Sequence, residues 1–356
     1  MTTNTDIDPS TQTASPVFGT SFEVTFHNNL QFKTCWSPLS LVRTFEPFSV
    51  RKPELSFDEV VRIFDTVEQF GTRLINLNGG ELFLREDSLE IIKVARKKFI
   101  TQLITNATLL NDEICKTLRK LNVPVMVYAP SFSKESYERL AQIKGSYRRL
   151  VSGVRTLIEA HLESVFLIPL SRPLVPDLEK SIVAINHMGG RSVKFTLYPG
   201  SGYGAQFLHE LALDLHENMQ MVFRIESLRE KYRTHVRLYH QFVAPYLGNN
   251  CGDSYALDAY GNIMPCAYLR LPFGNILKDQ LSQVWKRIAS EIGTRVGRNA
   301  RSPLECNGCN VVSPLTGYFC NGGCRCVAHN IYGKLAGPDL GCSYLALRRH
   351  IGQDKN

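Results

Sequence analysis

Cys306-Asn-Gly-Cys309 and Cys320-Asn-Gly-Gly-Cys324-Arg-Cys326 form the densest run of thiols in this chain. Cys251, Cys266 and Cys342 extend the run, so eight of the ten cysteines fall between residues 251 and 342. Short spacers let several sulfurs converge on one small cluster, and the glycines let the backbone turn around it. The tract therefore predicts a metal site.

Two other kinds of site share this spacing. Zinc binds four-cysteine sites, and a secreted protein pairs such cysteines as disulfides. The N-terminal residues 1–18 have neither a basic start nor an apolar core, so we expect no signal peptide and we disfavour disulfides. Spacing alone leaves iron-sulfur and zinc sites open.

Composition places the chain among ordinary globular proteins. Its 356 residues are 44% hydrophobic and 21% charged, with a net charge of +8. No apolar run approaches the ~20 residues of a membrane helix, so we expect a cytoplasmic protein with no membrane partner. Basic runs such as Arg96-Lys97-Lys98 are interpreted as solvated helix faces, and no charge block argues for nucleic acid.

Strand and helix patterns alternate through the first 200 residues, after a polar tail at 1–20 that we expect to be disordered. Ser56 and Glu59 form a capping-box signature at the start of one helix. The expected strands are 21–26, 74–77, 101–104, 123–128, 164–169 and 193–197. The expected helices between them are 56–70, 87–97, 112–121, 134–141, 146–160 and 176–188.

Helical patterns continue at 205–233, 235–246 and 281–292. Six strands with helices between them favour an α/β fold with a parallel sheet or partial barrel. The predicted architecture is a partial (β/α)6 TIM-like barrel over residues 21–234. A small cysteine-rich domain follows over residues 235–350.

Several motifs resemble the radical S-adenosylmethionine (SAM) family. Gly79-Gly80-Glu81 is similar to the GGE motif, which the resemblance places at the methionine amino group of SAM. The segment 105–110 (TNATLL) is similar to the family's TNGTLL, with Ala107 where Gly is usual. The segment 145–147 resembles the family's KGSF stretch. These motifs imply a barrel with its ligand site at the carboxyl ends of the strands.

The C-terminal part resembles the SPASM domain of one subgroup of this family. Residues 258–266 are similar to its G-x4-C element, and 273–276 with Trp285 to its GNI and W stretch. The resemblance implies two auxiliary [4Fe-4S] clusters. Cys251, Cys266 and Cys324 would hold the first, and Cys306, Cys309, Cys320 and Cys342 the second. The first lacks a fourth thiolate, for which Cys326, a non-cysteine ligand and a substrate all remain open.

One departure from the family concerns the SAM-cleaving cluster. The family binds it with C-x3-C-x2-C after the first strand, where this chain has Asn28, Phe32 and Cys35. Three thiolates are needed because the fourth iron must stay open to chelate SAM. Trp36 stands where an aromatic residue flanks the adenine in the family. We therefore expect no SAM-cleaving cluster, no catalytic residue and only a vestigial SAM site at Trp36 and Gly79–Glu81.

Three functions follow from these expectations. The first is a pseudoenzyme that binds a precursor peptide, or assists an active radical SAM enzyme, in the maturation of ribosomally made peptide natural products. A ferredoxin or flavodoxin is a further partner on this hypothesis. The second is an active peptide-modifying radical SAM enzyme with unusual cluster ligands. The third is a structural zinc protein.

Overall fold

The structure is a computed structural model of the chain, and it describes residues 17–38, 40–41, 53–196, 198–240, 254–292, 324–333 and 335. The strands of its main sheet are β1 (Gly19–Glu23), β4 (Leu74–Asn78), β5 (Ile100–Thr105), β6 (Val125–Tyr128), β7 (Ser164–Pro169), β8 (Ser192–Thr196), β9 (Arg237–His240), β10 (Tyr255–Leu257), β11 (Asn262–Met264) and β12 (Gly274–Asn275). A small separate pair consists of β2 (His27–Asn28) and β3 (Ser40–Leu41).

The main sheet has the order β12-β11-β10-β1-β4-β5-β6-β7-β8-β9. Strands β1 and β4 to β9 run parallel, β10 joins β1 in parallel, and β11 and β12 continue antiparallel. The predicted α/β class with a largely parallel sheet is therefore confirmed.

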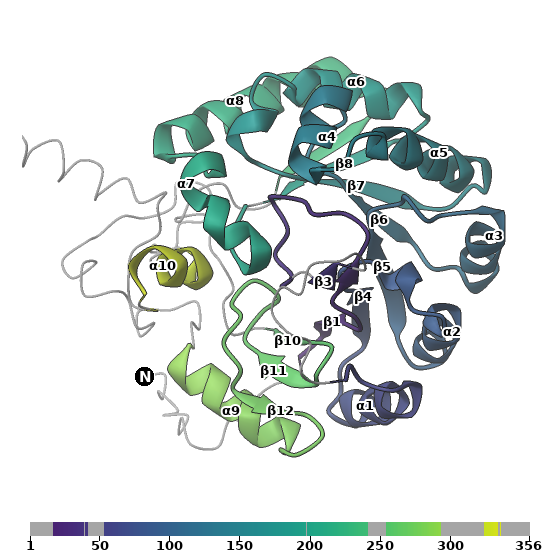
Figure 1. Cartoon of the computed structure of the whole chain (residues 1–356), viewed down its shortest axis with the longest axis vertical. Coiled ribbons are helices and arrows are strands. Elements are labelled where there is room, and N and C mark those ends of the chain that lie inside the picture. Colours follow the sequence, from purple (N-terminus) through teal and green to yellow (C-terminus); the bar gives the residue numbers. More distant parts are fainter. Residues whose placement is uncertain are drawn as a thin grey trace, which may run out of the picture.

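The helices that cover this sheet follow its strands in turn (Figure 1). They are α1 (Phe57–Gln69), α2 (Ser88–Lys98), α3 (Asp112–Leu121), α4 (Lys134–Ala141), α5 (Ser146–Glu159), α6 (Leu178–His187), α7 (Leu208–Leu211), α8 (Leu215–Tyr232), α9 (Leu281–Glu291) and α10 (Arg325–Tyr332). Figure 1 shows α1 to α6 as an outer arc, with β10, β11, α9 and α10 on its open side.

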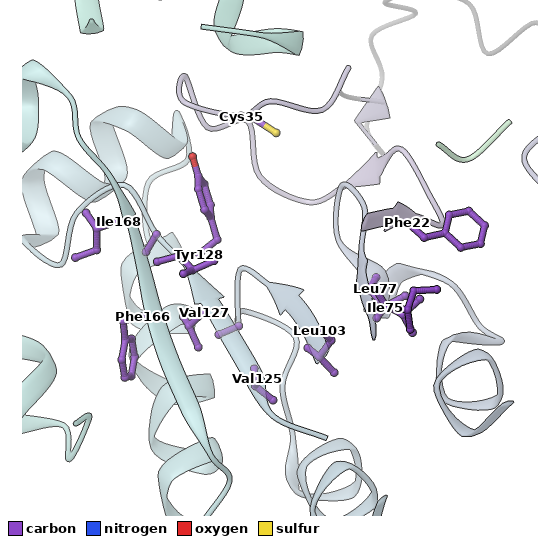
Figure 2. Close-up of a cluster of buried hydrophobic side chains, with 14 of the residues drawn as sticks. Phe22, Cys35, Ile75, Leu77, Leu103, Val125, Val127, Tyr128, Phe166 and Ile168 are labelled. Atoms are coloured by element: carbon purple, nitrogen blue, oxygen red, sulfur yellow. The ribbon is translucent and has the colours of Figure 1, made fainter. Parts of the chain in front are cut away.

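The core fills the space between the sheet and its helices (Figure 2). Alternate strand residues supply it, because successive side chains of a strand point to opposite faces. Fully buried examples are Phe22, Ile75, Leu77, Leu103, Val125, Val127, Phe166 and Ile168. The expected capping box of α1 is present, since Ser56 accepts from the Glu59 amide and Glu59 from the Ser56 amide.

Two sequence-based expectations need correction. The helix expected over 235–246 is wrong at 237–240, because β9 lies there and pairs with β8. Val236 and Leu238 are buried while Arg237 and Tyr239 are exposed, which is the two-residue period of a strand. The helix expected over 205–233 is interrupted at residues 212–214, where a second capping box starts α8.

Parts of the predicted N-terminal tail and of the predicted C-terminal domain lie outside the described residues. Strand β1 begins at Gly19 and Val17 is buried, so the chain is ordered from there, whereas residues 1–16 of the predicted tail lie outside the described residues. The turn 258–261 joins β10 to β11, and Gly261 adopts φ +76° there. Within the described ranges no helix has the length and apolar character to cross a membrane.

Candidate functional site

The mouth loop, residues 24–38, follows β1 and crosses the carboxyl ends of the parallel strands. Figure 2 shows Cys35 on this loop, beyond the end of the strand that carries Tyr128. Ligand sites of parallel α/β folds lie at this edge because the loops that follow the strands converge there. The residues of the expected vestigial SAM site all lie on or against this loop.

Gly79 and Gly80 end β4 and lie directly beneath the mouth loop. The Gly80 amide donates to the Thr25 carbonyl at 2.8 Å, and the Glu81 amide donates to the His27 carbonyl at 2.7 Å. A Cβ atom at Gly80 would stand 2.2 Å from the His27 carbonyl oxygen. Glycine is needed here because two backbone segments approach each other too closely for any side chain. These two amides are thus used by the chain itself.

The carboxylate of Glu81 is fully buried and turned toward β5. It accepts from the Thr105 hydroxyl at 2.8 Å and from the Asn106 amide at 2.8 Å. Burial raises the pKa of Glu81 to about 7, against the opposing effect of these hydrogen bonds. A carboxylate so enclosed holds the ends of β4 and β5 together.

The first cluster-ligand position is held by side-chain hydrogen bonds. The Oδ1 of Asn28 accepts from the Leu30 amide at 3.0 Å. Next to it, Asn29 donates to the Thr108 hydroxyl and accepts from the Asn106 side-chain amide, each at 2.9 Å. These contacts join the mouth loop to the segment that resembles TNGTLL.

The second ligand position carries a packed aromatic ring. Phe32 is 2% exposed, and its ring packs edge-on against Tyr128 and Tyr137 with centroid separations of 5.9 and 5.4 Å. A phenyl ring has no donor atom for iron, and this one contributes to the hydrophobic core.

The third ligand position retains its thiol in an environment that keeps it protonated. Cys35 is 7% exposed, and burial raises its pKa to about 12. Its amide donates to the Phe32 carbonyl, and its carbonyl accepts from the Gly204 amide. One buried thiol, an amide and a phenyl ring do not fit the three-thiolate cluster that the sequence resemblance implies.

Trp36 connects the mouth loop to the C-terminal part. Its ring packs edge-on against Tyr128 at 4.9 Å and against Tyr268 at 6.0 Å. Its Nε1 atom is buried and has no hydrogen-bond partner among the residues that the structure describes. The expected adenine-flanking residue is therefore held between two tyrosines.

Three C-terminal cysteines gather around Tyr268. Cys266 accepts from the Leu269 amide at 3.3 Å, and Cys326 donates to the Tyr268 carbonyl at 3.0 Å. Burial raises the pKa of Tyr268, with smaller contributions from the charges of Cys266, Cys324 and Cys326. Cys324 is buried at the N-cap of α10. Hydrogen bonds to cysteine sulfur of the kind made by Leu269 are one way in which proteins tune iron-sulfur clusters.

The other predicted metal ligands cannot be placed. Cys251, Cys306, Cys309, Cys320 and Cys342 lie outside the described residues. In the part of the chain that the structure does describe, no three His, Cys, Asp or Glu side chains form a group that could hold a single metal ion. Among the described residues, the predicted ligands Cys266 and Cys324 both lie near Tyr268, as does Cys326. Cys115 is a buried core residue of α3.

Sequence reasoning missed a charged pair at the end of β1. Arg270 donates to the carboxylate of Glu23, which is 1% exposed. The two residues are 247 positions apart, so no local pattern signals the contact. Arg270 also lines a cavity of about 700 Å³ between the mouth loop, residues 201–206, the turn after β10 and α10. This volume is within the range of small-molecule and cofactor sites.

Two family models match the chain. Residues 34–179 match the radical SAM superfamily, and residues 251–310 match SPASM, an iron-sulfur cluster-binding domain. The PqqA peptide cyclase of Granulibacter bethesdensis is 22% identical, over 96% of this chain and 91% of the relative. The AdoMet-dependent heme synthase of Methanosarcina barkeri is 24% identical, over 83% of this chain and 89% of the relative.

Solved structures share the fold. Streptococcus suis SuiB bound to its precursor peptide SuiA has a TM-score of 0.67 at 14% identity, covering 90% of this chain and 74% of SuiB. Native anSMEcpe with bound AdoMet has a TM-score of 0.68 at 14% identity, covering 94% and 98% of the two chains. At these identities the likeness extends to the fold and no further.

Proposed function

This chain belongs to the radical SAM superfamily and carries a SPASM domain, and from that membership we propose that it recognises a peptide for modification without cleaving SAM itself. Both parts of the predicted resemblance are confirmed by the two family matches. Relatives of the chain are enzymes, and a peptide substrate is consistent with the relatives named PqqA peptide cyclase and with SuiB bound to its precursor peptide.

The observation that carries the proposal is the ring of Phe32. A cluster that chelates SAM needs three thiolates around the mouth loop. Phe32 instead fills the second position as a core residue, Asn28 uses its oxygen to cap the loop, and Cys35 is held as a neutral thiol. These contacts join the loop to the rest of the fold through residues of this chain.

The iron-sulfur chemistry is proposed for the C-terminal part alone. Cys251, Cys266 and Cys324 would hold the first auxiliary [4Fe-4S] cluster, and Cys306, Cys309, Cys320 and Cys342 the second. The positions of Cys266 and Cys324 near Tyr268 are consistent with the first set. Bound clusters would stabilise this part of the fold and relay electrons. Cytoplasmic partners would then be an active radical SAM enzyme, with a ferredoxin or flavodoxin as electron donor.

A second candidate is an active radical SAM enzyme that modifies peptides. The named relatives are a cyclase and a heme synthase, and Gly79-Gly80-Glu81 follows β4 in this chain. This function would require cluster ligands from outside the C-x3-C-x2-C positions. It predicts tight SAM binding by the iron-loaded protein, whereas the pseudoenzyme lacks the open iron that would anchor SAM.

Anaerobic reconstitution separates these functions. We expect brown protein with about eight irons per chain, because two cubanes of four irons are proposed. The active enzyme would hold about twelve irons, and a structural zinc protein would be colourless. After reduction and addition of SAM, we expect neither methionine nor 5′-deoxyadenosine to accumulate. Multiple-turnover formation of both products by the purified chain alone would overturn the proposal.

A further inference from the structure

The cavity behind the mouth loop has aromatic walls and a polar end. Phe26, Tyr203 and Tyr260 line it, with Phe26 and Tyr260 packed edge-on at 5.0 Å. Ser201, Arg270 and His329 supply polar groups from three separate segments of the chain. Binding cavities commonly combine apolar walls with a few convergent polar groups that fix the orientation of a ligand.

Arg270 is held with one side of its guanidinium engaged. Its Nη1 atom donates to the buried carboxylate of Glu23 and, at 3.4 Å, to the Ala267 carbonyl. Its guanidinium carbon lies 5.7 Å from the centre of the Phe26 ring. Among the described residues neither Nε nor Nη2 has a hydrogen-bond partner, although Arg270 is only 17% exposed. The Nε and Nη2 donors, which together form one fork of the guanidinium, are therefore held in position and make no hydrogen bond to a described residue.

Two residues of the cavity wall carry polar atoms without a partner in the described part of the chain. The hydroxyl of Ser201 is buried, with the residue 2% exposed, and it makes no hydrogen bond to a described residue. The Nδ1 atom of His329 is likewise buried and has no hydrogen-bond partner among those residues. Buried polar groups are nearly always satisfied, because an unmade hydrogen bond loses the hydration that the group had in water. Such groups in a cavity wall point to a ligand that satisfies them.

The carboxylate of Asp258, in the same wall, already accepts hydrogen bonds from neighbouring residues. Asp258 accepts from the Tyr260 amide at 3.0 Å and from the amide and side chain of Asn262 at 2.9 Å each. The unused polar groups are thus a guanidinium fork, a hydroxyl and an imidazole nitrogen. Each of these groups can donate to an anion, and a guanidinium fork matches the two oxygens of a carboxylate.

We propose that this cavity binds a carboxylate of the peptide, with Arg270 as its anchor, Ser201 and His329 as additional donors, and an apolar neighbour against Phe26 and Tyr260. The inference rests on the proposed peptide-recognition function and adds the group that is recognised. The carboxylate is either an Asp or Glu side chain or the C-terminus of the peptide.

Binding of short probes by the iron-loaded protein tests this assignment. The probes are N-acetyl-Phe-Asp-amide for a side-chain carboxylate, N-acetyl-Asn-Phe for a C-terminal one, and N-acetyl-Phe-Asn-amide as the neutral isostere. Isothermal titration should give at least tenfold tighter binding for one of the first two. The probe that binds identifies the source of the carboxylate, and equal binding of all three would overturn the proposal.

Two variants check that Arg270 and Ser201 are responsible. Arg270→Lys keeps a cation beside Glu23 but removes the fork, so the preference for carboxylate should fall at least tenfold. Arg172→Lys, at a surface ion pair with Glu217, is the matched control and should leave binding unchanged. Ser201→Ala should weaken binding about threefold or more while leaving the thermal unfolding midpoint equal or higher, because the lost hydroxyl had no partner.

These outcomes are independent of SAM chemistry. The titrations contain neither SAM nor reductant, so equal binding of the three probes by the unsubstituted protein would contradict this assignment without bearing on the proposal that the chain does not cleave SAM. Conversely, SAM cleavage together with the expected carboxylate binding would contradict only the proposal that the chain does not cleave SAM. If Arg270→Lys does not fold, Ser201→Ala decides, since unchanged affinity in that variant contradicts the assignment.

Discussion

The mouth loop meets the C-terminal part where Trp36 packs against Tyr268, and the mouth loop differs from the cysteines near Tyr268 in the interactions that each region shows. In the mouth loop, main-chain hydrogen bonds and the packed ring of Phe32 fix residues 24–38. Near Tyr268 lie three cysteines, Cys266, Cys324 and Cys326. In the first region, core and main-chain contacts surround the three positions of the family's cluster ligands, whereas the second region carries three cysteines. The comparison teaches that a shared fold does not by itself fix which residues stand at the positions where the family binds metal.

The largest expected contrast is in iron content. Cys324→Ala should lose about four irons per chain, because it removes a proposed ligand of the first auxiliary cluster. Cys35→Ala, the matched control at the mouth, should lose none. Iron analysis of both anaerobically reconstituted variants measures the contrast. A loss of about four irons in Cys35→Ala would show that the mouth binds a cluster after all.

Replacing the ring that fills the second ligand position should cost the most stability. Phe32→Ala leaves a cavity between Tyr128 and Tyr137, and we expect the free energy of unfolding to fall by about 3–5 kcal/mol. Phe223→Ala is the control, since Phe223 is 69% exposed and its change should stay within about 0.5 kcal/mol. Urea unfolding compares the two. Equal effects would mean that Phe32 is no core residue.

Glu81 should make the barrel mouth sensitive to pH. Its pKa in the folded chain is about 7, above the ordinary value of 4.5, so its stabilising contribution is complete below pH 4.5 and is lost as pH rises to 7. The loss amounts to about 3 kcal/mol, at 1.36 kcal/mol for each pKa unit. Glu81→Gln cannot titrate. The difference in unfolding free energy between wild type and this variant should therefore change by about that amount between pH 4.5 and 8, and a constant difference would contradict the burial argument.

Local patterns were sufficient to predict most of the barrel. Apolar periodicity and the Ser56–Glu59 capping box placed α1, because both signals act within one turn of helix. The strand β9 was missed although Val236 and Leu238 alternate with exposed neighbours, because a four-residue strand gives a weak signal beside a long helix. The second capping box, at Asp214 and Glu217, was an available signal for the break before α8.

For the candidate site, too, one part could be predicted from the sequence and another part could not. The positions of Asn28, Phe32 and Cys35 followed from spacing, and their departure from the family is visible in the letters alone. The environment of each one did not follow, because it depends on residues far away in sequence, such as Tyr128 against Phe32. The ion pair of Glu23 with Arg270 and the cavity beside it likewise arise only when β10 pairs with β1.

The smallest expected effect tests whether hydrogen bonds hold the mouth loop without metal. The Tyr128 hydroxyl lies 2.9 Å from both the carbonyl and the hydroxyl oxygen of Thr34, so Tyr128→Phe should lower the free energy of unfolding by about 0.5–1.5 kcal/mol. Tyr239→Phe, at a residue that is 48% exposed, should change it by less than about 0.5 kcal/mol. The Tyr128 effect should be the same in iron-loaded and iron-free protein, because no metal contributes to this contact. If chelation of iron abolished the effect of Tyr128→Phe, the mouth loop would depend on a cluster. The contrast between the mouth loop and the cysteines near Tyr268 would then disappear.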